Sequence, residues 1–100
     1  MTKIKVNKDN NNITSIEVIG HTGYNEIGKD IVCASISSIV TTTINGIIRL
    51  DNSIKYESKE GFLKIEILNH TNITDTLIDN MLELLEELEK DYKDYVKIIK

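Results

Sequence analysis

The feature that most constrains the fold is a long apolar stripe with helical spacing in the middle of the chain. The stripe consists of Val32, Ile36, Ile39, Val40, Thr43, Ile44, Ile47 and Ile48. This spacing predicts a helix that runs to about Leu50. Asp30 is the expected N-cap, because its carboxylate can accept backbone N–H groups of the first turn. So wide a stripe indicates a core helix.

Shorter patterned segments lie on both sides of this helix. Alternating residues predict one hairpin from strands 3–8 and 13–19, and a second from strands 53–57 and 62–68, with Gly61 in a left-handed conformation at its turn. A second helix is predicted from Thr74 and Asp75 to about Lys90, followed by a strand over 95–100. The order β-β-α-β-β-α-β predicts an α+β fold with two helices packed on a mostly antiparallel sheet, in one domain over residues 1–100.

Composition excludes several classes of protein. The net charge of −4 argues against nucleic acid as a direct partner. We expect no membrane association, because no apolar run approaches the length of a bilayer span. We also expect a cytoplasmic location, because the N-terminus alternates instead of forming a signal peptide. One cysteine and two separated histidines give no zinc-binding spacing, so no metal is expected.

The chemical interest of the chain lies in Cys33 and His21. Cys33 falls in the first turn of the predicted core helix, where the helix dipole favours thiolate, and His21 directly follows the second predicted strand and Gly20. An imidazole near such a thiol can take its proton, which is the basis of a cysteine nucleophile. Each residue also has a more ordinary interpretation, Cys33 as a buried apolar residue and His21 as a surface residue. His70 lies in a polar turn and is expected at the surface.

Other residues of this segment are candidates for supporting roles. Asp30 either caps the helix or orients His21, and Ser37 lies one helical turn after Cys33, where it either donates a hydrogen bond or simply packs. Gly20, Gly23 and Gly28 match no phosphate-binding motif, and we expect them to let an exposed loop over residues 22–29 bend.

The stretch Gly20-His21-x-Gly23-Tyr24, followed by Gly28-x-Asp30-Ile31-Val32-Cys33-Ala34-x-x-Ser37, resembles the ribosomal-processing cysteine protease family called Prp. The resemblance extends over essentially the whole chain. It implies an enzyme that removes the short N-terminal extension of the large-subunit ribosomal protein numbered twenty-seven.

The same resemblance implies roles for individual residues. Cys33 would be the nucleophile and His21 the general base and acid, with Asp30, Ser37 and the three glycines in support. It also implies a homodimer, no cofactor, and movement of the loop between the catalytic pair. Thr22 stands where alanine is common in that family.

Two other classes of function stay open from the sequence. In a noncatalytic ribosome-assembly or peptide-binding module, Cys33 would only pack, and a mixture with the partner would show binding without product. In a redox sensor, Cys33 would oxidise reversibly with no need for His21.

Overall fold

The computed structural model describes residues 1–20 and 30–100, with the side chain of residue 30 not described. Its elements follow the predicted order: β1 (Thr2–Asp9), β2 (Asn12–Ile19), α1 (Asp30–Leu50), β3 (Ile54–Lys59), β4 (Phe62–Ile67), α2 (Asn72–Asp91) and β5 (Val96–Ile99). The predicted loop over residues 22–29 lies outside the described residues.

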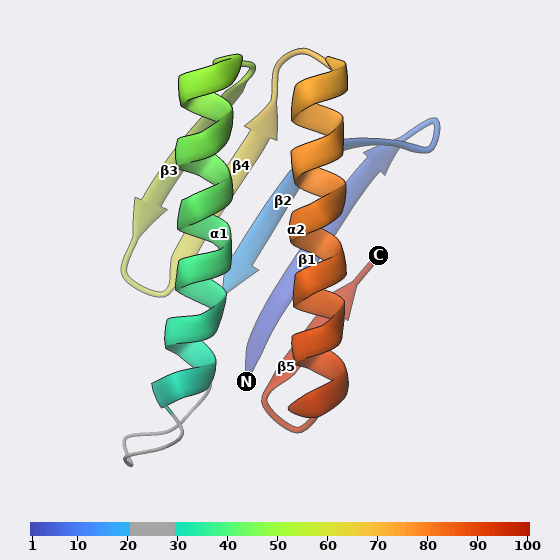
Figure 1. Ribbon diagram of the computed structural model, residues 1–100. Helices are drawn as coiled ribbons and strands as arrows, with labels where there is room; N and C mark the ends of the chain where they lie inside the picture. Colours follow the sequence, from blue (N-terminus) through green and yellow to red (C-terminus); the bar gives the residue numbers. More distant parts are fainter. Residues whose placement is uncertain (21–29) are drawn as a thin grey trace.

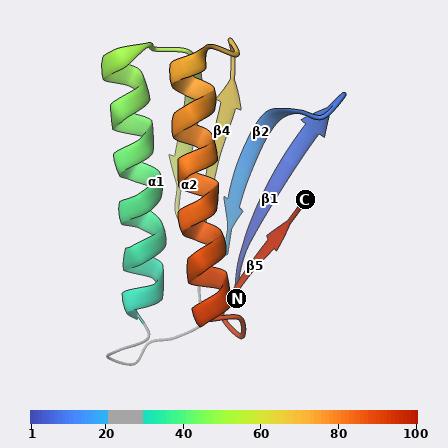
Figure 2. The ribbon, with the colours of Figure 1, turned by 45° about the vertical axis from the view of Figure 1, so that its right-hand side comes forward.

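The five strands form one sheet in the order β3-β4-β2-β1-β5. Three of the four strand pairings are antiparallel, and the pairing of β1 with β5 is parallel. Both helices lie side by side on one face of this sheet, and they run in opposite directions (Figures 1 and 2). The α+β fold with two helices on a mostly antiparallel sheet is confirmed. The start of α1 and the end of α2 therefore lie at the same end of the helical layer.

The core fills the space between the helices and the sheet. Its fully buried members are Ile4, Ile16, Val32, Ile47, Ile65, Ile78, Met81, Leu85 and Val96. Alternation along β1 and the stripe along α1 place these residues on the faces that meet. The predicted stripe was too wide at one position, because Ile48 is 37% exposed. In α2, Leu84 is likewise 41% exposed.

Asp51 joins the end of α1 to the start of α2. Its carboxylate oxygen Oδ2 accepts hydrogen bonds from the hydroxyls of Thr71, of Ser53 (2.7 Å) and of Thr74 (2.8 Å). These bonds, that of Thr71 foremost, lower the pKa of Asp51 below its ordinary value of 3.8. Thr71 is also the N-cap of α2, because its hydroxyl accepts from the amide of Thr74 at 3.1 Å. The predicted start at Thr74 was therefore too late.

Helix α1 is apolar over a longer stretch than we expected of any segment in this chain. Over Ile31–Leu50 its mean hydropathy reaches 1.7, so in the described chain one helix is long and apolar enough to cross a bilayer by length and composition alone. The expectation that no run approaches this length was wrong. In the fold, this helix packs one face on the sheet, with Val32, Val40 and Ile47 almost fully buried.

Candidate active site

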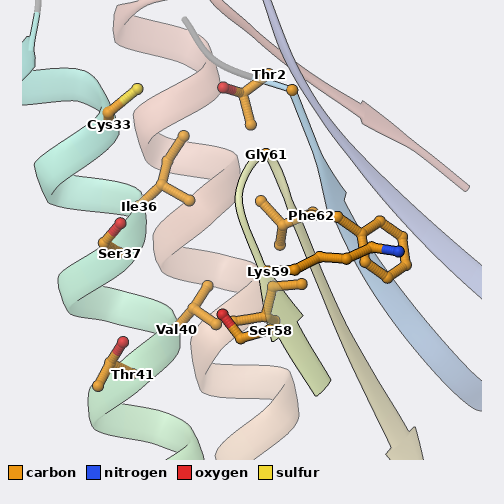
Figure 3. A pocket seen from close by; sticks show the side chains of 13 residues that line it. Thr2, Cys33, Ile36, Ser37, Val40, Thr41, Ser58, Lys59, Gly61 and Phe62 are labelled. Carbon is orange, nitrogen blue, oxygen red and sulfur yellow. The ribbon is translucent and has the colours of Figure 1, made fainter. Parts of the chain in front are cut away.

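Cys33 lies in the first turn of α1, and its side chain, which is partly buried, lines a pocket of about 250 Å³ between this helix and the sheet. The helix contributes Cys33, Ile36, Ser37, Val40 and Thr41. The facing wall is formed by Thr2, Val18, Gly20, Ser58, Lys59, Gly61, Phe62 and Leu63. Figure 3 shows the thiol at one end of this pocket, with Ser37 and Thr41 following it along the helix. The thiol predicted from the sequence is therefore open to a cavity rather than enclosed in the core.

Gly20 fixes the backbone at the end of β2. Its φ of +90° is one that glycine adopts readily, and a Cβ at this position would lie 2.9 Å from the carbonyl oxygen of Met1. Its amide donates a 2.8 Å hydrogen bond to the carbonyl of Gly61, which lies in the turn between β3 and β4. Gly20 lines the same pocket as Cys33, so the residue directly before His21 reaches this cavity.

The structure describes only some of the other predicted site residues. Ser37 is exposed and lines the pocket one turn after Cys33, as the helical spacing predicted. His21, Gly23 and Gly28 lie outside the described residues. Asp30 is the first residue of α1, rather than a residue before it, and the orientation of its carboxylate lies outside the described part.

His70 is confirmed as a surface residue. Its Nδ1 atom lies 3.0 Å from a carboxylate oxygen of Asp75, and its side chain is 39% exposed. It lies just before the start of α2, whereas Cys33 lies in the first turn of α1, and the two helices start at opposite ends of the helical layer (Figure 1). His70 therefore takes no part in the pocket. Among residues 1–20 and 30–100, no group of three or more His, Cys, Asp or Glu side chains is arranged to hold a metal ion.

Sequence reasoning missed the contribution of Thr2. This residue begins β1, is only 2% exposed, and lines the pocket opposite α1. Its hydroxyl is shut off from solvent and has no hydrogen-bond partner in the part of the chain that the structure describes. A threonine at the start of a strand is unremarkable in sequence, because threonine is common in strands. Only the packing of β1 beside β2 and β5 brings it to the pocket.

The arrangement suits attack on a carbonyl group. The first turn of a helix has backbone N–H groups without partners inside the helix, and such groups stabilise the negative oxygen of a tetrahedral intermediate. Cys33 offers a nucleophile in that turn, and the pocket wall contains the apolar side chains of Val18, Ile36 and Leu63. An extended peptide can place one side chain against these residues while its backbone passes the thiol.

Comparison with known proteins finds relatives among cysteine proteases. The family model described as "Cysteine protease Prp" matches residues 1–97. The ribosomal processing cysteine protease Prp of Staphylococcus aureus (strain Mu50) is 31% identical over 94 residues, which cover 90% of this chain and 89% of that protein. The Bacillus subtilis (strain 168) protein of the same name is 29% identical, covering 86% of this chain and 84% of that protein.

Solved structures agree with the fold. An essential ribosomal processing protease Prp from S. aureus, in complex with a covalently linked product peptide, superposes with a TM-score of 0.86 and 24% identity, covering 99% of this chain and 98% of that one. SMU.848 from Streptococcus mutans superposes with a TM-score of 0.79 and 26% identity, covering 99% and 94% of the two chains. The two helices on a five-stranded sheet are thus an arrangement that these proteins share.

Proposed function

Because this chain belongs to the cysteine protease Prp family, we propose that it is the endopeptidase that removes the N-terminal extension of the large-subunit ribosomal protein numbered twenty-seven. Its relatives are named as ribosomal processing proteases, and one is bound to a substrate peptide. The observation that carries the proposal is the position of Cys33, in the first turn of α1 and open to a pocket that Gly20 also lines.

In the proposed reaction, the Cys33 thiolate attacks the carbonyl carbon of the scissile bond, after His21 has taken the thiol proton. Backbone N–H groups at the start of α1 hold the oxyanion. As the C–N bond breaks, His21 gives its proton to the leaving amine, and the extension stays on Cys33 as a thioester. Water then hydrolyses the thioester, which releases the extension with a free carboxylate and restores the thiol.

The proposal also assigns supporting roles to residues near Cys33 and His21, and it includes the assembly, location and partner of the enzyme. Asp30, the first residue of α1, is proposed to orient His21, while Ser37 stands one turn after the nucleophile on the same wall. The enzyme is proposed to need no cofactor, to act as a homodimer in the cytoplasm, and to bind a protein terminus rather than nucleic acid. A basic ribosomal-protein terminus suits a chain of net charge −4.

The test is cleavage of the extended ribosomal protein from the same genome, followed by mass spectrometry of the products. We expect wild-type protein to release the extension, and both Cys33→Ala and His21→Ala to release none while keeping the fold. His70→Ala is the matched control, because this histidine lies away from the pocket, and it should cleave at the wild-type rate.

Three results would overturn the proposal. Cleavage by the Cys33→Ala variant would remove the nucleophile from the mechanism. Binding of the extended protein by the wild type without any product would instead favour a peptide-binding module. A genome whose ribosomal protein lacks the extension would also leave the proposed enzyme without this substrate.

A further inference from the structure

We propose that the hydroxyl of Thr2 is a substrate-binding group that forms a hydrogen bond with a main-chain amide group of the bound peptide. The proposal rests on the proposed peptidase activity and adds a residue that none of the sequence motifs includes. Thr2 faces the pocket from the strand wall, and Cys33 faces it from the helix wall (Figure 3). The hydroxyl would thus hold the peptide on the side of the cavity opposite the nucleophile.

Main-chain contacts on both sides hold the backbone of Thr2 in place. The amide of Thr2 donates a 2.9 Å hydrogen bond to the carbonyl of Tyr95, and Thr2 pairs with Val96 in the parallel ladder between β1 and β5. On the other side, the next residue of β1 pairs with Ile19 near the end of β2. Thr2 therefore lies between two neighbouring strands, which hold its Cα in place beside the pocket.

None of the described residues supplies a partner for this hydroxyl. Thr2 is 2% exposed, and within residues 1–20 and 30–100 its Oγ1 atom has neither solvent contact nor a hydrogen-bond partner. A buried polar atom without a partner is unfavourable, and native proteins rarely keep one without a reason. Of the other pocket residues, Val18, Ile36 and Leu63 have apolar side chains that offer no polar atom. A peptide amide that enters the pocket would supply the missing bond.

The buried hydroxyl of Thr2 should lower the stability of the free protein and strengthen its binding of a peptide. Because the hydroxyl is already removed from water, the free protein carries the full penalty of its burial, and a peptide that reaches it gains a hydrogen bond without displacing water from it. The oxygen is closed to solvent in the free protein, so the walls formed by α1 and β1 must part slightly as the peptide enters. Removing the hydroxyl should therefore stabilise the free enzyme and weaken its hold on the substrate.

The experiment compares Thr2→Val, which replaces the hydroxyl by a methyl group, with Thr2→Ser, which keeps it. Kinetics are measured with a synthetic peptide that spans the cleavage junction of the extended ribosomal protein. For Thr2→Val we expect KM to rise roughly three- to tenfold with kcat and the pH profile unchanged. We also expect its Tm to rise by about 4 °C or more. Thr2→Ser should keep a KM close to that of the wild type.

The outcomes separate this inference from the proposed function. If the wild type does not cleave the peptide, the proposed function fails, and the inference fails with it. If the wild type cleaves and Thr2→Val has an unchanged KM, the hydroxyl does not bind substrate and only this inference fails. A lower kcat with a shifted pH profile would mean that Thr2 acts on the catalytic groups instead. A fall in Tm for Thr2→Val would show that the hydroxyl already has a partner in the free enzyme.

Discussion

Replacement of Gly20 by alanine tests how the end of β2 is held beside the pocket. An alanine at φ +90° is strained by roughly 1 to 3 kcal/mol, since L side chains rarely adopt this conformation. In addition, the new Cβ would lie 2.9 Å from the carbonyl oxygen of Met1, so the start of β1 would have to shift. Together these effects should lower the free energy of unfolding by roughly 2 to 4 kcal/mol.

The assay is thermal unfolding followed by circular dichroism. For a domain of 100 residues, this loss corresponds to a fall in Tm of roughly 10 to 20 °C. Gly46→Ala is the matched control, because Gly46 lies inside α1 and its added Cβ would meet only Leu77 Cδ1, at 4.0 Å. That variant should gain about 0.5 to 1 kcal/mol, as alanine favours a helix interior over glycine. A Gly20→Ala protein that melts at the wild-type temperature would refute the reasoning.

Two further predictions concern polar contacts away from the pocket. The pKa of Asp51 is lowered in the folded protein, so its contribution to stability is present above the unfolded value near 3.8 and is lost as the pH falls through the folded value. Urea unfolding between neutral and acidic pH should therefore show a smaller loss of stability in Asp51→Asn than in the wild type, and equal losses would contradict this. The carboxylate of Glu89 accepts a 2.6 Å hydrogen bond from the amide of Ile98 in β5, so Glu89→Ala should lower the free energy of unfolding by about 1 to 2 kcal/mol. Glu86→Ala, which removes only a surface ion pair to Lys100, should change it by less than about 1 kcal/mol, and equal effects would argue against the role of Glu89.

Local patterns predicted the elements well because each one is determined largely by its own residues. The bounds of α1 followed from its apolar period and from Asp30, and the positive φ of Gly61 followed from its place in a hairpin turn. The width of the buried stripe was predicted less well. Ile48 is exposed because only part of the surface of α1 faces the sheet and α2, and periodicity does not reveal how much of a helix its neighbours cover.

Contacts between segments that lie far apart in the chain could not be predicted from the sequence. The parallel pairing of β5 with β1 joins the two ends of the chain, and no local pattern encodes such a pairing. The cap of α2 at Thr71 depends on support from Asp51, which lies 20 residues earlier. The same holds at the pocket, because Thr2 reaches it only through the sheet, whereas Cys33 and Ser37 could be assigned to one helix face from their spacing.

The most direct test of the central claim is to detect the proposed acyl-enzyme by mass spectrometry of the intact protein after rapid acid quenching. The chain has a single cysteine, so a thioester can form at only one residue. With the extended ribosomal protein as substrate, we expect a transient mass increase equal to the extension minus one water, located on Cys33 by peptide mapping and absent from Cys33→Ala. Cleavage that proceeds with the adduct on another residue, or in the Cys33→Ala protein, would contradict the account.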